Sequence, residues 1–235
     1  MTRVVTKLRC YSPSKSDTPK GNVKHLYYIA DRNNALPDKD GNTIFGYMNY
    51  KNLNNHKKCD IAKHIKDTSL MKNNVYRGII SLKEDDAIRL GYDNRKSWES
   101  MIKKALYPIS AVMGIPFSRL EYVGVVHMKK GNPHLHYMFW DREQGINDSF
   151  ITITQQNKIR DITTKAIYKD ELQELYKQKD ELKKDIRSRD LINDMKAVNI
   201  NSCSGKIPFV KMQNKYRKLL IQNFKRISKM LPKSR

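Results

Sequence analysis

The clearest pattern of hydrophobic and polar positions lies between residues 121 and 141, EYVGVVHMKKGNPHLHYMFWD. Two apolar runs, Tyr122–Met128 and Leu135–Trp140, flank the segment Lys129–Pro133, which ends in the turn signal Gly-Asn-Pro. β-Branched and aromatic residues favour strands on both sides of this turn. The pattern therefore predicts a β-hairpin.

Three of the six histidines fall within this hairpin, at His127, His134 and His136. Side chains alternate between the two faces of a strand, so His134 and His136 share one face. His127 joins that face if it pairs across the hairpin with either of them, whereas a register slip of one residue would turn it away. Three neutral imidazoles that converge on one point would suit a divalent metal, with positions left for water or a phosphate oxygen.

Upstream of the hairpin, hydrophobic periodicity predicts both strands and helices. Strands are expected over Thr2–Tyr11 and Val75–Leu82, and helices over Asn22–Arg32, from Lys83–Asp86 onward, and over Lys96–Met113. Pro108 predicts a kink or a break in the last of these helices. Other expectations are a loop at Ser12–Gly21 and surface positions for His56 and His64.

Downstream of the hairpin, the chain is predicted to be largely helical. The segment SFITIT reads as a short strand or as the lead-in to a helix. Gln155–Ala197 is highly charged and predicts one long helix, or two helices broken near Arg160–Lys169. A final basic helix is expected over Ile207–Leu231, and the chain is expected to be truncated at its C-terminal end.

This order of elements indicates the α+β class, with a central antiparallel sheet that carries the three-His hairpin and is flanked by helices. We predict a catalytic core over residues 1–150. Residues 151–235 are predicted to form a charged helical region that packs on the core or extends it.

The chain carries 46 basic and 24 acidic residues, a formal net charge of +22. So much positive charge indicates a polyanionic partner, most simply nucleic acid. No apolar run approaches the ~18–20 residues of a membrane span, and the N-terminus lacks the apolar segment of a secretory signal. Three distant cysteines, Cys10, Cys59 and Cys203, fit free thiols in a reducing compartment, so we expect a cytoplasmic protein.

Three blocks of the chain, HLYYIADR, YRGIISLKEDDA and the hairpin itself, resemble the HUH endonuclease superfamily. The resemblance is closest to the plasmid mobilisation relaxases of the MobP/MobL type and covers residues 22–141. It implies an antiparallel sheet flanked by helices, a divalent ion (Mn²⁺ or Mg²⁺) bound by the motif histidines, and attack on one DNA strand at an origin of transfer. Transferred to this sequence, the metal ligands are His127, His134 and His136.

The resemblance also implies an N-terminal nucleophile, which falls on Tyr28 or Tyr27, with Tyr28 favoured and His25 as a less favoured substitute. A tyrosine can form a covalent 5′-phosphotyrosine intermediate, which conserves the bond energy needed to rejoin the strand later. Because the ordinary pKa of tyrosine is about 10, its deprotonation or its attack needs assistance at neutral pH. The partner implied is single-stranded or hairpin DNA at the origin, together with accessory transfer proteins.

Basic residues near these motifs are expected to contact DNA phosphates, while aromatic residues stack on bases. The candidates for phosphate contact are Arg3, Lys7, Arg9, Lys24, Arg32, Arg77, Lys129 and Lys130. The general base is left open among Glu84, Asp85, Asp86 and Asp141, and the metal alone could suffice. Asp141 is also a candidate to orient a ligating histidine.

Two other functions compete with a relaxase. A rolling-circle replication initiator or an HUH transposase shares the chemistry but usually places its tyrosine after the metal motif, which would favour Tyr168 or Tyr176 here. A non-catalytic nucleic-acid-binding protein with a structural metal is the alternative of another class. Structural zinc sites are usually rich in cysteine, and no cysteine lies near the hairpin.

Overall fold

The computed structural model describes residues 4–49, 51–53, 57–143 and 150–188 of the 235-residue chain, with residues 182–188 described by their backbone alone. Six strands form one antiparallel sheet in the order β1-β4-β6-β5-β2-β3. The strands are β1 (Val5–Cys10), β2 (Phe45–Met48), β3 (Lys51–Asn52), β4 (Val75–Ser81), β5 (Leu120–His127) and β6 (His134–Asp141).

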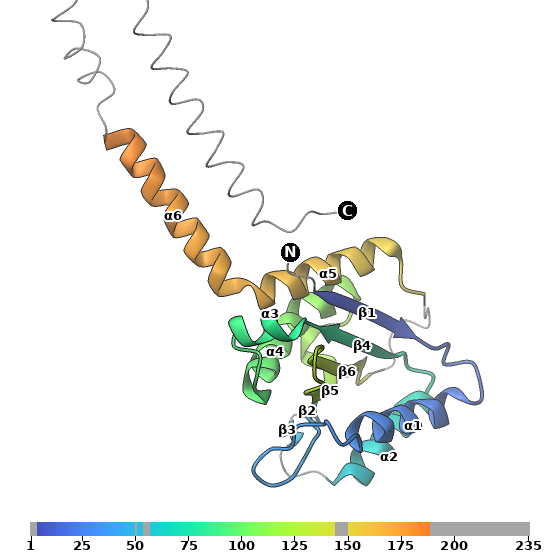
Figure 1. Ribbon diagram of the computed structural model, residues 1–235. Coiled ribbons are helices and arrows are strands. Elements are labelled where there is room, and N and C mark those ends of the chain that lie inside the picture. Colours follow the sequence, from blue (N-terminus) through green and yellow to red (C-terminus); the bar gives the residue numbers. More distant parts are fainter. Residues whose placement is uncertain (1–3, 50, 54–56, 144–149, 189–235) are drawn as a thin grey trace, which may run out of the picture. The chain divides into compact units, whose positions relative to one another are not determined.

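Helices flank the sheet (Figure 1). They are α1 (Thr18–Ala30), α2 (Lys58–Leu70), α3 (Glu84–Arg89), α4 (Arg95–Val112), the short 3-10 helix η2 (Phe117–Arg119) and α5 (Ile153–Ile167). The chain continues after α5 with a further helix, α6 (Lys169–Ser188). The predicted α+β class, with an antiparallel sheet flanked by helices, is therefore confirmed. None of the helices in the described ranges is long and apolar enough to span a membrane.

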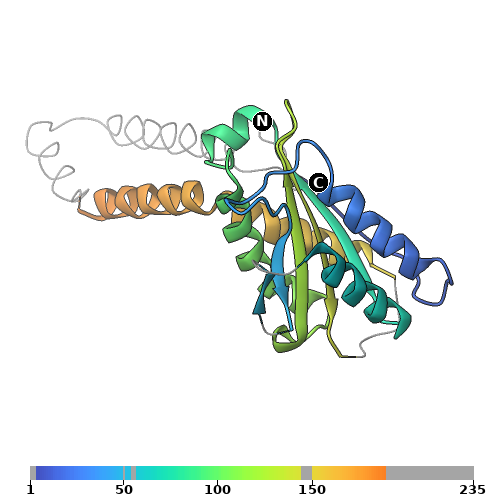
Figure 2. The same cartoon turned by 90° about the horizontal axis from the view of Figure 1, so that it is seen from below.

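The two faces of the sheet are covered by different helices (Figures 1 and 2). Residues of α1 and α2 share one apolar cluster with Val123, Val125 and Met138 of the central strands. Residues of α4 and α5 share the other cluster with Leu135, Tyr137 and Phe139. The hairpin β5–β6 thus lies in the middle of the sheet, with its alternate residues facing opposite helix layers.

Two glycines make room for large rings on the face toward α4. A Cβ atom on Gly78 would lie 2.1 Å from the ring of Tyr137, and one on Gly124 would lie 2.4 Å from the ring of Phe45. Tyr137 pairs with Gly78 and Phe45 pairs with Gly124, so each aromatic ring lies over backbone that has no side chain. Any side chain at these positions would displace a ring from the core.

Several local expectations change at the element boundaries. The predicted loop over Ser12–Gly21 is wrong in its second half, because α1 already begins at Thr18, with Pro19 in its first turn, where the missing N–H costs nothing. Helix α4 does not break at Pro108. One side of it, which includes Trp98 and Leu106, is fully buried, and this packing outweighs the loss of a single hydrogen bond.

The segment after the hairpin follows the helical alternative. Thr152 caps α5 through a reciprocal pair of hydrogen bonds with Gln155, so SFITIT includes a helix lead-in. α5 and α6 are separated at Tyr168, inside the stretch where a break was predicted. The chain divides into two compact units, Thr2–Lys169 and a second that begins at Asp170 in α6. The expected helix over Ile207–Leu231 lies outside the described residues, and the domain boundary at residue 150 stays a prediction.

Candidate metal centre and nucleophile helix

The three hairpin histidines converge on one face of the sheet. His127 pairs directly with His134, while His136 lies opposite Val125, so the predicted shared face is confirmed. The ring centroids are 4.8 Å to 5.1 Å apart, and one ring nitrogen from each histidine lies within 4.8 Å of the other two. At this spacing, a single ion could bind one nitrogen lone pair from each of the three histidines.

Hydrogen bonds to backbone carbonyls fix two of these rings. Nε2 of His127 lies 2.7 Å from the Ile29 carbonyl oxygen, and Nδ1 of His134 lies 2.8 Å from the Asn132 carbonyl oxygen. A carbonyl only accepts, so these nitrogens carry the protons. Nδ1 of His127 and Nε2 of His134 keep their lone pairs, as metal-ligating histidines require.

Burial keeps the cluster uncharged. It lowers the pKa of His127 and His134, and it lowers that of His136 to about 3, with a further contribution from the neighbouring histidines. Neutral imidazoles are ready to act as ligands at neutral pH without first losing a proton. Among the described residues no carboxylate or thiol joins the group, so these ligands would leave a bound divalent ion its full charge. The residues present fit such an ion.

Helix α1 lies against this cluster. Its fully buried residues Leu26 and Ile29 anchor it to the sheet, and the Ile29 carbonyl accepts the hydrogen bond from His127. One turn earlier, the ring of His25 meets that of His136 edge-on, with centroids 6.1 Å apart. Burial and the charge of Arg77 lower the pKa of His25 to about 4.

The two adjacent tyrosines of α1 have different surroundings. Tyr28 stacks on His25 with centroids 6.4 Å apart, and 52% of its surface is exposed. Arg32 donates a hydrogen bond to the Tyr28 hydroxyl, and its guanidinium carbon lies 4.2 Å from the ring centroid. Tyr27 instead packs against the apolar cluster shared with α2, and the Lys58 ammonium lies 5.5 Å from its ring centroid.

A cleft of about 920 Å³ opens beside the tyrosines, between the end of α1 and the hairpin turn. Its lining residues are Lys24, Tyr27, Tyr28, Asp31, Arg32, Asn33, Asn34, Met128, Lys129 and Lys130. Four of the predicted phosphate contacts, Lys24, Arg32, Lys129 and Lys130, therefore border one cavity together with both candidate nucleophiles. The three histidines do not line this cleft, but Met128, which follows His127 in the chain, does.

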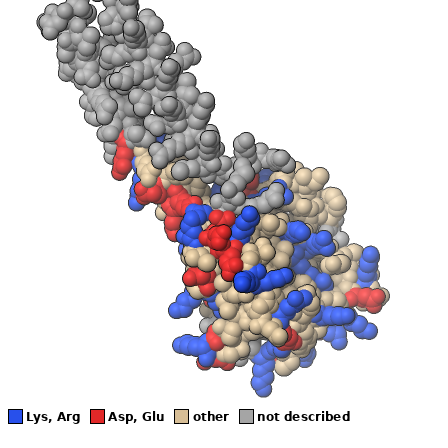
Figure 3. Space-filling model, viewed as in Figure 1, with Lys and Arg blue, Asp and Glu red and all other residues tan. Residues whose placement is uncertain are grey.

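Three more predicted phosphate contacts lie on the same face of the sheet as the histidines. Lys7 and Arg9 are exposed on β1, and Arg77 is half-buried on β4. The register places Lys7 opposite Ile79, which in turn pairs with His136. Figure 3 shows Lys and Arg side chains gathered around β1 and α1, with acidic side chains near α3. Arg3 lies outside the described residues.

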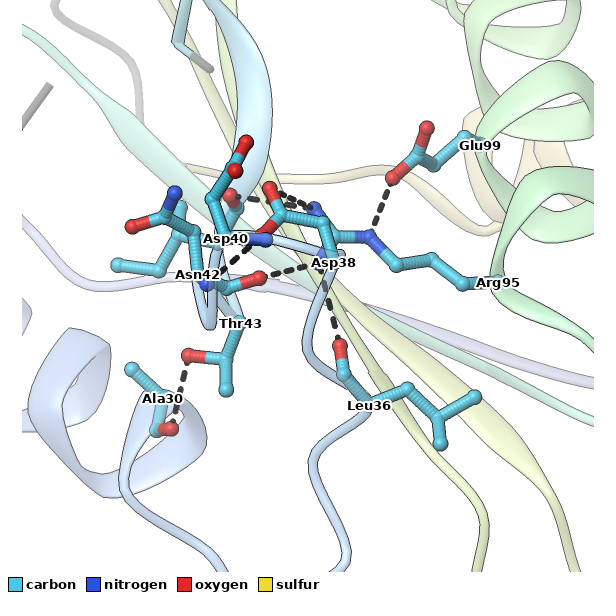
Figure 4. Close-up of polar contacts among 9 residues, drawn as sticks. Ala30, Leu36, Asp38, Asp40, Asn42, Thr43, Arg95 and Glu99 are labelled. Carbon is cyan, nitrogen blue, oxygen red and sulfur yellow. Dashed lines mark hydrogen bonds and ion pairs between the residues drawn. The ribbon is translucent and has the colours of Figure 1, made fainter. Parts of the chain in front are cut away.

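The loop after α1 is braced by Arg95, a residue that sequence reasoning missed (Figure 4). The guanidinium donates to the carbonyl oxygens of Leu36, Asn42 and Ile44, and it also pairs with Glu99. The side chain of Thr43, in the same loop, donates to the carbonyl of the last residue of α1 at 3.0 Å. The cleft wall is thereby tied to α4.

None of the predicted carboxylates belongs to the histidine cluster. Asp141 is at the opposite end of β6, where its side chain accepts hydrogen bonds from Arg119 and from the Glu143 backbone, so its proposed role in orienting a ligating histidine is wrong. Glu84 accepts from the Gly131 backbone N–H in the hairpin turn at 2.8 Å. Asp85 is exposed, and Asp86 pairs with Arg89.

The expectation that His64 is a surface residue is also wrong. Its side chain is only 24% exposed, and Nε2 lies 2.6 Å from a carboxylate oxygen of the buried Glu121. The same carboxylate accepts from the Trp140 indole and from the Asn49 backbone N–H. No local pattern reveals this cluster, because His64 and Glu121 are 57 residues apart. His56 lies outside the described residues.

Comparison with protein-family models matches residues 8–234 to the family described as MobL relaxases. The match covers nearly the whole chain and includes α1, the hairpin and α5. No curated protein matches the chain, and no solved structure matches it.

Proposed function

The chain belongs to the MobL relaxases, and from that premise we propose that it cuts one strand of DNA at a plasmid origin of transfer and later rejoins it. The family supports a relaxase or nickase role, and DNA at such an origin is the corresponding substrate. The observation that carries the specific chemistry is the convergence of three neutral imidazoles directly beneath the helix that bears Tyr28.

The histidines supply the electrophilic half of the proposed reaction. His127, His134 and His136 would hold a divalent ion, Mn²⁺ or Mg²⁺, which when bound polarises the cleaved phosphate and neutralises charge that develops on its oxygens. The backbone bonds from His127 and His134 keep two of the rings aimed at the same point before any substrate arrives.

Tyr28 supplies the nucleophile. Its phenolic oxygen forms a bond to phosphorus while the bond from phosphorus to the 3′ oxygen breaks, and the 3′ oxygen takes up a proton. The product is a 5′-phosphotyrosine beside a free 3′-hydroxyl, and the reverse attack by a 3′-hydroxyl restores the strand. Arg32 favours this role, since a guanidinium that donates to the phenolic oxygen stabilises its ionised form.

The surroundings of the two tyrosines favour Tyr28 over Tyr27. Tyr28 is exposed at the cleft and connects to His136 through the ring of His25. Tyr27 contributes to the apolar packing against α2. His25 is the third candidate nucleophile, because its uncharged imidazole lies at the edge of the cluster.

The test uses a supercoiled plasmid that carries the DNA flanking the coding sequence. With MnCl₂, wild-type protein should convert the plasmid to the open circle and leave a covalent adduct that survives detergent. EDTA should abolish both products. Y28F should lose the adduct by at least about 100-fold, whereas Y27F, the matched loss of one hydroxyl, should retain it within a few-fold. A persistent adduct in Y28F would reject Tyr28, and its loss in a His25→Ala variant alone would assign the attack to His25.

The competing functions make different predictions in the same assay. A replication initiator or transposase would lose its adduct in Y168F or Y176F, the tyrosines after the metal motif. Tyr168 ends α5 and Tyr176 lies on α6 with 61% exposure. A non-catalytic binding protein would retain oligonucleotide binding but show no metal-dependent nicking with any variant.

A further inference from the structure

Arg77 lies on the metal-binding face of β4, beneath the start of α1. It pairs with Arg9 on β1 and with Met138 on β6, two residues along the strand from His136. A Cβ atom on Gly21 would lie 3.5 Å from Nη2 of Arg77, so the first turn of the helix passes directly over the guanidinium. This arginine is therefore half-buried under the helix, unlike the exposed Lys7 and Arg9 beside it.

Two neighbours hold the guanidinium in one orientation. Nε and Nη2 both donate to the side-chain oxygen of Asn22, at 2.9 Å and 2.5 Å. Asn22 is 1% exposed, and its amide nitrogen donates to Ser69 of α2 at 2.9 Å. On the other side, the ring centroid of Tyr11 lies 4.4 Å from the guanidinium carbon. Such a preformed fork loses little conformational entropy when it binds a ligand.

The positive charge of Arg77 has no acidic partner among the described residues. No carboxylate in the described ranges forms an ion pair with it, and the residues described offer no acceptor to Nη1. Burial lowers the pKa of Arg77, which means that the fold desolvates this cation at a cost. An enclosed cation without a counter-charge indicates that an anion completes the site.

The unused edge of the guanidinium defines the shape of that anion. Asn22 occupies the edge formed by Nε and Nη2, which leaves the edge formed by Nη1 and Nη2. Two parallel N–H groups on one edge match two oxygens of a phosphate or carboxylate. The proximity of Arg77 to the metal cluster favours phosphate, since its charge reaches His25, which in turn contacts His136.

The position of Arg77 on the sheet sets its distance from the cleaved bond. One strand across and two residues along from His136 corresponds to about 8 Å between Cα atoms, from the standard strand spacing and rise. That separation is spanned by about one or two nucleotides of an extended strand.

We propose that Arg77 binds the DNA phosphate about one or two nucleotides away from the cleaved phosphate, with Asn22 and Tyr11 as its positioning residues. This inference rests on the proposed function, because the strand it anchors is the one that crosses the histidine cluster. Arg77 thereby sets which phosphate reaches the metal. Lys7 and Arg9, which are exposed on the neighbouring strand, would also contact the DNA backbone but would not fix which phosphate they bind.

The test replaces one phosphate at a time by a neutral methylphosphonate, in an oligonucleotide that spans the mapped nick. Binding is measured by fluorescence anisotropy and cleavage by adduct formation, for wild type, R77Q and R9Q. R9Q is the matched control, since it removes the same charge from the paired residue of the neighbouring strand. R77Q should weaken binding about 10- to 100-fold, the range for a lost hydrogen bond to a charged group, and R9Q only about 2- to 5-fold.

The decisive result is a coupling at one position. Neutralising the phosphate that Arg77 contacts should cost wild type and R9Q about tenfold or more, yet cost R77Q less than about threefold, because its partner is already gone. Coupling at one position cannot arise from a general loss of folding, which would affect all positions equally. If each methylphosphonate weakens binding by the same factor in R77Q as in wild type, at every position, the proposal is overturned.

The outcomes separate this proposal from the proposed function. If wild-type protein forms no adduct, the strand-transfer chemistry fails, and the binding arm still decides Arg77. An oligothymidylate of about 20 nucleotides, longer than common single-strand sites, then serves as the probe. Equal affinities of R77Q and R9Q for it would reject the Arg77 site. If adducts form and coupling is absent, the relaxase chemistry stands and the Arg77 site is rejected.

Discussion

The two faces of the sheet are built from the same strands but differ in their residues. Toward α4 and α5, the central strands present apolar side chains such as Leu135, Tyr137 and Phe139, all fully buried. Toward α1 and α2, the same strand β6 presents His134 and His136 before it returns to apolar residues. The alternation of side chains along one strand therefore places stability on one face and chemistry on the other.

This difference implies that the two faces respond differently to mutation. The α4 side lacks the half-exposed histidines and the enclosed arginine of the α1 side, so truncations there should act through folding. Truncations at His134 and His136 should act mainly through metal and DNA, because these two side chains are only partly buried and therefore lose less packing than a fully buried apolar residue.

The largest expected effect is on the apolar face. Phe139→Ala removes a fully buried ring that stacks on Tyr76 with centroids 4.9 Å apart, and it should lower the free energy of unfolding by about 3–5 kcal/mol. Denaturant unfolding measures this loss. Adduct formation per folded molecule should be unchanged. If Phe139→Ala keeps the wild-type free energy of unfolding but loses the adduct, the face toward α4 does not act through folding alone.

The next effect is expected on the face that carries the three histidines. His136→Ala should weaken Mn²⁺ binding at least about 100-fold, since three-ligand sites depend on each donor, while the unfolding free energy without metal should not fall. Titration calorimetry with MnCl₂ gives the affinity. His64→Ala changes a histidine of α2, on the same side of the sheet but outside the cluster, and is the control that should bind Mn²⁺ as wild type does. Equal losses in both variants would reject the metal centre.

A smaller effect on stability is expected at Glu121, a residue on the α1 and α2 side of the sheet that lies outside the histidine cluster. Glu121→Gln keeps the shape of a buried carboxylate but loses its charge-assisted bonds to His64 and Trp140, which should cost about 1–3 kcal/mol of stability. Burial alone would raise the pKa of Glu121, but hydrogen bonds from His64 and the Asn49 backbone outweigh it and hold the pKa below 4.5.

The sign of this shift gives a pH dependence. A carboxyl whose pKa is lower in the folded state stabilises the fold above its ordinary titration range and loses that contribution as the pH falls through the folded pKa. Wild type should therefore lose stability below about pH 4.5 more steeply than Glu121→Gln. Unfolding free energies measured across this range decide the point, and parallel curves would show that Glu121 contributes nothing through its charge.

Local sequence patterns predicted the elements whose signals are short-range. The two apolar runs on either side of the hairpin turn, the apolar run of β4 and the amphipathic stripe of α4 all form the elements expected of them. The convergence of the three histidines was predictable because the register of a hairpin follows from its turn, and that register alone decides whether His127 joins the other two.

The remaining features depend on contacts between distant residues. The sequence predicted Arg77 only as one of several phosphate contacts, and its fixed orientation depends on Asn22, which is 55 positions away. The Arg95 brace and the His64–Glu121 pair are long-range in the same sense. Adjacent tyrosines on a helix point about 100° apart, so the sequence left Tyr27 and Tyr28 open. Their unequal exposure reflects how α1 packs against α2.

The hydrogen bond from His127 to the Ile29 carbonyl joins an imidazole of the candidate metal centre to the backbone of the nucleophile helix. An ion that fixes the His127 ring also constrains α1, and a displaced α1 would tilt that ring. Coupling between ion binding and the ordering of α1 is reciprocal. If the ordered helix raises the affinity for the ion, the bound ion stabilises the ordered helix by the same free energy. Ion occupancy and the alignment of the candidate nucleophile Tyr28 would therefore be coupled.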